Sequence, residues 1–428
     1  MIIEFSVKNF RSFKDEQTFS LYTQTKGNSL LSENSILCPN TRNLRVLKSA
    51  GVYGANASGK SNLLIAIDIL CFIVTGSKNF DEVDGIRGFD PYRLSLSSEK
   101  NPVSLSIEFV SKKQNRFRYA VSFTRNQIRS ERLEYNPSGR WVKLFSRKPS
   151  GAITFAKTAR SGIQQIPFFP NQCYLSVAAL SAATSETIRD AYMFFKRGAS
   201  VMYIGKDDRF PLYPNIQSAL PKISSFIQFA DTGVEKISVE KRAFPPKHSF
   251  PPEFPDEVKV SFQFDAEHRS VFYHRGENGV LSQFDFYNES EGTQRLFNRL
   301  PLIFDVLTIG GILIIDELEN SLHPFICELL VRLFNDPETN PLGAQLIFST
   351  HDVSLLSKNL LTPEQVWFTE KKNGATTLFS LADFKDDVTA ESPIAHWYEE
   401  GRFGAFPNYN WHKIKQLFAG GAQNGKEK

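Results

Sequence analysis

The chain lacks the sequence features of disulfide-rich, secreted and membrane-spanning proteins. Its four cysteines are far apart and none belongs to a CxxC pair, which argues against a zinc site or a disulfide framework. The first residues, MIIEFSVKNF, contain no basic segment followed by an apolar one, so we expect no signal peptide. No apolar run reaches the roughly 18 residues that indicate a membrane span. Together with reduced cysteines, these absences predict a cytoplasmic protein.

A strong excess of one charge is also missing. The chain has 50 Lys and Arg against 46 Asp and Glu, a net charge of +4, which permits contact with nucleic acid without arguing for it. Apolar residues, in contrast, make up 41% of the 428 residues, and Phe alone occurs 38 times, which favours packed sheet and helix layers. The length predicts two or three domain-sized units. No internal repeat or sustained heptad pattern occurs, so we expect no long coiled coil.

The N-terminal half reads as strands around one buried helix. Alternating or apolar runs predict strands at 2–7 and 46–53, and a mostly apolar run predicts a buried helix at 61–75. Several short alternating runs between 103 and 145 predict an antiparallel meander. Residues 181–230 have a helical pattern.

The C-terminal half alternates between helices and strands. A Pro-rich loop ends near residue 255, strands are predicted at 258–264 and 270–275, and residues 289–368 read helix, strand, helix, strand. The expected fold class is α/β, with a mixed-sheet core, an antiparallel β subdomain and a helical insert. The predicted parts are an N-terminal lobe (1–180), the helical insert with the Pro-rich loop (181–255), a C-terminal lobe (256–418) and a disordered tail (419–428).

Residues 54–61, GANASGKS, match the phosphate-binding pattern GxxxxGK[ST] in full and are called the phosphate loop below. The loop follows a predicted strand and precedes a predicted helix, as the motif requires; a glycine-rich turn is the alternative. Its backbone N–H groups would surround phosphate oxygens, Lys60 would reach the β- and γ-phosphates of ATP, and the Ser61 hydroxyl would ligate Mg²⁺. The residues predicted to bind the nucleotide here are Asn56, Ala57, Ser58, Gly59, Lys60, Ser61 and Asn62.

Two acids follow the aliphatic run Ile312–Ile315 and are called the acidic pair, Asp316 and Glu317. Such a run predicts a parallel strand buried on both faces, and ligands of open α/β sheets bind where such strands end. Asp316 would hold Mg²⁺, and Glu317 would polarise the attacking water. A solvated acidic turn is the alternative.

A second apolar strand ends in Ser349-Thr350-His351-Asp352. His351 at this strand end is a candidate contact to the γ-phosphate, and a purely structural histidine is the alternative. Between the two strands, Asn320 and Ser321 precede Pro324, so they are also candidate helix caps.

The segment ESEGTQR, residues 289–295, precedes another apolar run. Ser290 is a good N-cap, which is the simple interpretation. Its small residues also leave backbone N–H groups exposed at a helix N-terminus, which can bind an anion. We call residues 290–294 the signature segment.

These motifs resemble those of ABC-type ATPases of the SMC/RecF class. The matching stretches are NFRSF at residues 9–13, GKSN, IIDE and STHD. Within that class the chain is similar to the AAA-family ATPases of bacterial antiphage defence, of the AbiLi/RloA type. That similarity is carried by ESEGTQRLFNRLP, DELENSLHP, FNDPETNPLGAQLIFSTHD and GRFGAFP, and it is densest in residues 289–356.

The resemblance implies an ABC/SMC-like P-loop ATPase in which two subunits close head to tail over ATP, with a higher oligomer also allowed. Ser290, Gly292, Thr293 and Gln294 would then act on the ATP held by the partner. Asn320 and Ser321 would lie in the D-loop between the sites, His351 would be the switch histidine, and Arg11 would lie near the nucleotide. For Arg11, a solvated turn is the alternative. A partner effector encoded nearby, often a RloB-type protein with a TOPRIM-like nuclease fold, is implied as well.

The chain departs from the family pattern in three places. No Gln lies between Ser61 and Asn101, so the usual glutamine loop is missing, and Asp90 is a candidate substitute. The signature reads SEGTQ where transporters have LSGGQ. A long coiled coil with a zinc hook is absent.

Two functions fit these observations. The first is a defence ATPase that controls an effector, and the alternative is a RecF-like ATPase that binds DNA in repair. Residues 135–185 contain no acid but several Lys and Arg, so they are an effector dock, a contact to phosphate backbones or a solvated hairpin rim. A fused nuclease of the OLD type is not expected, since only about 70 residues follow the ATPase motifs.

Overall fold

The computed structural model describes residues 1–23, 29–38, 41, 43–155, 166–196, 201–205, 216–230, 232–243, 256–356, 360–384, 388, 392–405 and 410–419. The Pro-rich loop at 244–255 and the predicted tail beyond residue 419 lie outside the described residues.

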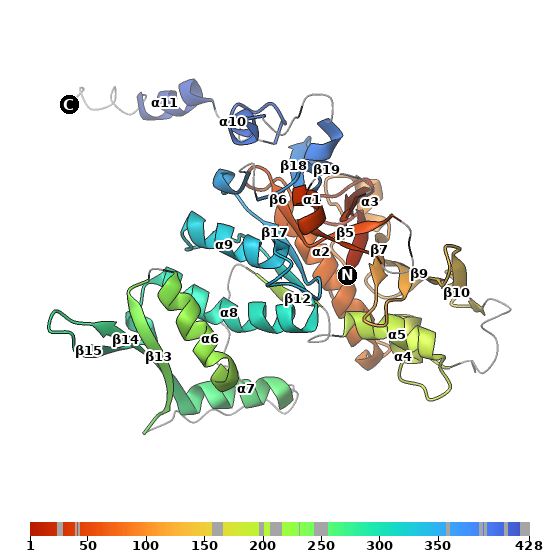
Figure 1. Cartoon of the computed structure of the whole chain (residues 1–428). Helices are drawn as coiled ribbons and strands as arrows, with labels where there is room; N and C mark the ends of the chain where they lie inside the picture. The colour runs from red at the N-terminus through yellow and green to blue at the C-terminus, as the bar shows by residue number, and fades with distance from the viewer. Residues whose placement is uncertain are drawn as a thin grey trace, which may run out of the picture.

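A six-stranded sheet forms the centre of the molecule (Figure 1). Its strands, in spatial order, are β12 (Val201–Ile204), β16 (Ile312–Ile315), β17 (Gln345–Ser349), β6 (Ser49–Tyr53), β18 (Val366–Lys372) and β19 (Ala375–Ser380). The first five strands are parallel and β19 is antiparallel to β18. Every residue of β6, β16 and β17 is buried, which explains their nearly continuous apolar sequences.

A seven-stranded antiparallel sheet lies beside the central sheet. Its order is β11 (Ile153–Phe155), β10 (Val142–Arg147), β9 (Ile128–Asn136), β8 (Arg116–Phe123), β7 (Val103–Val110), β1 (Ile2–Lys8) and β2 (Gln17–Ser20). Helix α2 (Lys60–Gly76) shares one apolar core with residues of both sheets. The segment Lys60–Asn79 has the length and hydropathy of a membrane span, but 56% of an 18-residue stretch within it is buried inside the protein, and the segment carries the lysine of the phosphate loop.

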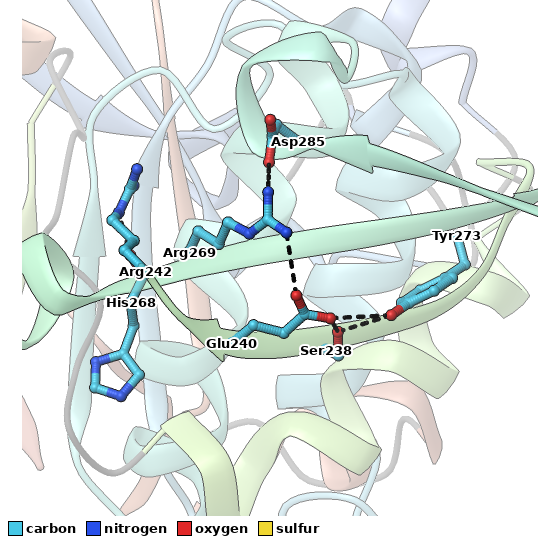
Figure 2. Close-up of polar contacts among 7 residues, drawn as sticks. All are labelled: Ser238, Glu240, Arg242, His268, Arg269, Tyr273 and Asp285. Atoms are coloured by element: carbon cyan, nitrogen blue, oxygen red, sulfur yellow. Dashed lines mark hydrogen bonds and ion pairs between the residues drawn. The ribbon is translucent and has the colours of Figure 1, made fainter. Parts of the chain in front are cut away.

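A second lobe contains a smaller antiparallel sheet, β13 (Val234–Lys241), β14 (His268–Arg275) and β15 (Leu281–Asp285). It packs with α6 (Ile216–Phe229), α7 (Asp256–Glu267) and α8 (Glu291–Ile309). Figure 2 shows polar side chains that join its three strands: Arg269 pairs with Glu240 and with Asp285, at 3.2 and 3.3 Å, and Tyr273 donates to Glu240. Of these contacts, the Arg269–Asp285 pair reaches the outer strand β15, which ends shortly before the signature segment.

The remaining elements are short or peripheral. A three-stranded sheet contains β3 (Tyr22–Thr23), β5 (Arg45–Leu47) and β4 (Ser35–Leu37). The other helices are α1 (Ser29–Glu33), α3 (Leu96–Lys100), α4 (Tyr174–Ala178), α5 (Glu186–Phe195), α9 (Pro324–Asn335), α10 (Ile394–Glu399) and α11 (Trp411–Ala419). Short 3₁₀ turns occur in several connections of the described residues, including Phe286–Asn288 before the signature segment.

The α/β fold class is confirmed, with its mixed sheet, antiparallel sheets and helices, whereas three local predictions need correction. Residues 46–53 do not form one strand, because β5 and β6 belong to different sheets. The helical reading of 181–230 missed β12, which gains its place only by pairing with β16. The strand predicted at 258–264 is wrong: the segment belongs to α7, where Val260 and Phe262 remain exposed, so its alternation does not mark a buried sheet face. The domain boundaries stay a prediction.

Candidate nucleotide-binding site

Three neighbouring parallel strands bring the sequence motifs to one edge of the central sheet. In the order β16, β17, β6, they are followed by the acidic pair, by His351 and by the phosphate loop. Since the carboxyl ends of parallel strands meet at the same edge, motifs almost 300 residues apart in sequence become neighbours. Lys60 Nζ accordingly lies 3.0 Å from His351 Nε2.

The phosphate loop curls around the Lys60 ammonium group, which donates to the carbonyl oxygens of Gly54 and Ala55 at 2.8 and 3.2 Å. Gly59 has φ = 120°, and a Cβ atom there would lie 2.5 Å from Thr376 Oγ1. Position 59 therefore requires glycine for its conformation and for its space. Asn56 and Ala57 are exposed at the loop surface, where backbone groups are accessible to an anion.

Residues far along the chain support the loop from β18 and β19. Thr376 Oγ1 donates to the Ser58 carbonyl oxygen at 2.6 Å, and Thr369 Oγ1 lies 2.6 Å from Ser58 Oγ. Sequence reasoning missed both threonines, because nothing around them marks a nucleotide site. Only the pairing of β18 with β6 places them beneath the loop.

A second support, also missed, comes from α10. The backbone N–H of Gly54 donates to the phenol oxygen of Tyr398, and burial raises the pKa of that phenol to about 12. The rings of Tyr398 and Phe403 both stack on Phe368. Phe403 belongs to the GRFGAFP stretch, and the family resemblance of that stretch was the sequence feature that pointed to this region. Phe406 and Pro407 of the stretch lie outside the described residues.

The acidic pair faces the start of α2. Ser61 Oγ donates to Asp316 Oδ1 at 3.0 Å, and Asp316 is only 2% exposed. A hydroxyl and a carboxylate in contact are the oxygen donors that Mg²⁺ prefers, so these two residues fit the cation by their chemistry. Glu317 is partly exposed and has φ = 55°, an uncommon conformation for a residue other than glycine.

Arg11 and Asn62 lie together beside the phosphate loop. Arg11 Nη1 donates to Asn62 Oδ1 at 3.3 Å, and its Nε donates to Asp90 Oδ2 at 3.2 Å. Arg11 thus lies beside the phosphate loop, in a left-handed turn with φ = 49°, and its contact with the nucleotide stays a prediction. Asp90 also pairs with Arg93. Asp90 thus binds two arginines. Within the described residues, no hydrogen bond joins its carboxylate to Asp316 or Glu317.

The signature segment forms the start of α8 and has the expected cap. Ser290 Oγ accepts from the backbone N–H of Thr293 at 3.2 Å and lies 2.9 Å from Thr293 Oγ1, while Gln294 Nε2 donates to the carbonyl oxygen of Glu289. Within the described part of the chain, the side-chain hydrogen bonds of these three residues stay between 289 and 294 and do not reach the phosphate loop. Gly292 packs against the backbone of Ser321.

The loop between the acidic pair and α9 is tied to the histidine. Glu319 Oε1 accepts from the backbone N–H of His351 at 2.6 Å. Ser321 has φ = 57°, and the backbone N–H of Asn320 donates to the Glu317 carbonyl oxygen. The suggestion that Asn320 or Ser321 caps α9 is wrong, because His323 is the N-cap and its Nδ1 accepts from Phe325 N–H.

The acid-free stretch is less uniform than its composition indicated. Arg140, Lys143 and Lys148 are exposed, whereas Arg147 is 4% exposed and donates to the carbonyl oxygens of Gln172 and Pro170. Two further cations of the stretch, Lys157 and Arg160, lie outside the described residues.

Comparison with known proteins places the chain in a family. The family described as "AAA domain, putative AbiEii toxin, Type IV TA system" matches residues 49–357. No curated protein matches the chain.

Several solved structures show low-identity similarity. The SmcHead bound to the C-winged helix domain of ScpA is 14% identical, with 90% of this chain and 98% of that chain covered and a TM-score of 0.43. The recombination mediator RecF with ATP is 11% identical, with 89% and 99% covered and a TM-score of 0.36. The cbiO1 protein from Clostridium perfringens is 16% identical, with 62% and 96% covered and a TM-score of 0.23.

The family match includes the phosphate loop, the signature segment, the acidic pair and His351, and it leaves out Arg11 and Tyr398. The chain is therefore a P-loop ATPase-type protein that belongs to the AAA family related to abortive-infection proteins.

Proposed function

We propose that this protein is the ATP-hydrolysing switch subunit of a bacterial antiphage defence system. In this proposal two copies close head to tail over ATP in the cytoplasm and thereby control a partner effector nuclease. The observation that carries the ATPase part is the convergence of Lys60, Asp316 and His351 at one sheet edge, with Lys60 Nζ 3.0 Å from His351 Nε2 and Ser61 Oγ 3.0 Å from Asp316.

The phosphate loop would bind the triphosphate of ATP. Its backbone N–H groups and the N-terminus of α2 supply positive potential, and Lys60 adds a full charge at the same point. Ser61 and Asp316 would hold Mg²⁺, which would neutralise charge on the phosphate oxygens when bound. Arg11 and Asn62, in contact beside the loop, would complete the nucleotide pocket.

Glu317 is the proposed general base. It directly follows the buried Asp316 and is partly exposed, so its carboxylate is accessible to a water near the γ-phosphate. His351 would contact the γ-phosphate, since it lies beside Lys60 at the end of the adjacent strand. The hydrogen bond from the His351 backbone N–H to Glu319 would couple the position of His351 to the loop at Asn320 and Ser321.

The signature segment supports closure between two copies. It presents a capped helix N-terminus with exposed Ser290 and Glu291, and the bonds of the Ser290 cap lie within the segment itself. Such an end attracts anions, and no phosphate-binding motif lies beside it in sequence. Ser290, Gly292, Thr293 and Gln294 would therefore approach the γ-phosphate held by the partner copy.

The ATPase part is tested by nucleotide binding and hydrolysis in Lys60→Ala. We expect this variant to lose ATP binding or turnover, because the only cation that the phosphate loop itself supplies is removed. Lys241→Ala changes an exposed lysine on β13 and serves as the control, which should behave as wild type. Hydrolysis at the wild-type rate in Lys60→Ala would contradict the proposed site.

The partner is tested separately, by purifying the chain with the product of the neighbouring gene. ATP-dependent retention of that product supports the defence switch, for which the family description gives the present support. The alternative, a RecF-like DNA-binding ATPase, predicts binding of duplex DNA that weakens steeply with salt. Exposed Arg140, Lys143 and Lys148 would then be the residues whose replacement reduces the salt dependence.

A further inference from the structure

Ser349, the last residue of β17, lies between the strand of the phosphate loop and the strand of the acidic pair. Its exposed fraction is 0%. Its hydroxyl donates to Asp316 Oδ1 at 2.6 Å and accepts from the backbone N–H of Glu317 at 2.8 Å. One buried hydroxyl therefore contacts both members of the acidic pair, through the side chain of one and the backbone of the other.

The backbone of Ser349 strengthens the same connection. Its carbonyl oxygen accepts from the Leu318 N–H at 3.0 Å, so three consecutive residues, 316–318, are bonded to this one serine. Glu317 lies within that span with φ = 55°. A left-handed conformation is unfavourable for an ordinary residue and persists only where its surroundings hold it. The Ser349 hydroxyl provides the hydrogen-bond acceptor that the Glu317 N–H needs in this conformation.

Asp316 Oδ1 has a second hydroxyl donor, Ser61, at 3.0 Å. The two donors differ in what else they can do. Ser61 begins α2 beside the phosphate loop and is the proposed ligand of the cation, whereas Ser349 is enclosed and remote from the surface. Ser349 is thus the donor that can keep Asp316 oriented independently of the nucleotide.

We propose that Ser349 is a positioning residue that sets the orientation of Asp316 toward the cation and of Glu317 toward the attacking water. It also links the acidic pair to His351, which follows it by two residues on the same chain segment. This inference rests on the proposed ATPase function and deepens it. Replacement of residues that orient metal-binding carboxylates typically lowers metal affinity or activity about 10- to 100-fold.

The test compares Ser349→Ala and Ser349→Thr with wild type, using the full chain. Affinity for a fluorescent ATP analogue is measured with Mg²⁺ and with EDTA, and kcat and KM for ATP are measured in parallel. We expect Ser349→Ala to keep the affinity in EDTA, to lose most of the gain that Mg²⁺ gives, and to lower kcat about 10- to 100-fold with little change in KM. Ser349→Thr retains the hydroxyl and should restore both properties in part.

Ser270→Ala is the matched control, because Ser270 is also a buried serine and its hydroxyl has no hydrogen-bond partner among the described residues. It should leave all of these quantities unchanged. One outcome is that wild type binds ATP without hydrolysing it while Ser349→Ala still reduces the Mg²⁺-dependent affinity. That combined result would contradict ATP hydrolysis and would still support the role of Ser349. Equal Mg²⁺ dependence in wild type and Ser349→Ala would overturn that role, whether or not ATP is hydrolysed. Thermal unfolding of each variant shows that a measured loss does not arise from unfolding.

Discussion

A Cβ atom on Gly292 would lie 2.7 Å from the carbonyl oxygen of Ser321. The signature segment thus touches the loop that follows the acidic pair of its own subunit, and at position 292 there is no room for a side chain without moving backbone. A Gly292→Asp change would disturb both segments at once. A test of contact with a partner subunit therefore has to be made at a neighbouring residue that has space.

Ser290 is that residue, because it is exposed and its side chain serves as the N-cap of α8. We expect Ser290→Asp to keep the cap but to place a negative charge where the partner's γ-phosphate would bind, which blocks closure and hydrolysis. Ser290→Asn has nearly the same shape, also caps helices and is neutral, so it should retain much more activity. Mass measurement with ATP, together with nucleotide affinity, checks this; loss of ATP affinity in Ser290→Asp alone would place the segment in its own subunit's pocket.

Glu317→Gln should bind ATP but hydrolyse it about 100-fold more slowly or worse, because an amide cannot take the proton of the attacking water. We expect this variant to accumulate as an ATP-bound dimer or larger assembly, visible by native mass measurement with ATP and absent with ADP. Asp305→Asn, on α8, removes an exposed carboxylate elsewhere and is the control. A wild-type rate in Glu317→Gln would show that another group activates the water.

Tyr398→Phe should weaken ATP binding while the fold remains intact. The change removes the phenol oxygen that accepts from the Gly54 N–H and leaves the ring stacked on Phe368. A single neutral hydrogen bond contributes about 0.5–1.5 kcal/mol, so the affinity for ATP should fall about 2- to 12-fold. Phe403→Ala instead removes buried ring contacts and should lower the free energy of unfolding by about 3–5 kcal/mol. Calorimetry of both variants distinguishes the two effects.

Glu131 is expected to govern the stability of the N-terminal lobe. Its buried carboxylate accepts from the backbone N–H groups of Tyr174 and Leu175 and from the Tyr119 hydroxyl. Glu131→Ala would leave these donors without an acceptor and should destabilise the protein by about 2–4 kcal/mol, measured by denaturant unfolding. Glu131→Gln keeps one acceptor oxygen and should cost less.

The same residue predicts a pH dependence. Burial raises the pKa of Glu131 above its ordinary value of 4.5. A raised pKa in the folded state means that the stabilising contribution is complete below 4.5 and is lost as the pH rises through the folded value. Glu131→Gln does not ionise and should remove this part of the pH dependence. An identical pH profile of unfolding in wild type and Glu131→Gln would contradict the assignment.

The sequence by itself determined the features that local patterns encode. GANASGKS specifies a glycine-rich turn into a helix, since the conformation at Gly59 and the N–H groups beside it are local properties. The aliphatic run Ile312–Ile315 specifies a strand buried on both faces, and Ser290 specifies a helix start. These patterns were enough to place the phosphate loop, the acidic pair, His351 and the signature segment on the correct kinds of element.

Tertiary structure decided which residues meet. The alternation at 258–264 was compatible with a strand, but the segment forms part of α7. A short alternating run forms a strand only where a neighbouring strand is available to pair with it, and the sequence of the run does not contain that information. Strand β12 and the threonines at 369 and 376 gain their roles only from pairing with distant strands. Ser349 and Tyr398 reach the site in the same way, across gaps in sequence that no local pattern spans. Hydrogen bonds at 2.6–3.0 Å depend on strand order and register, and these are set by the packing of the whole core.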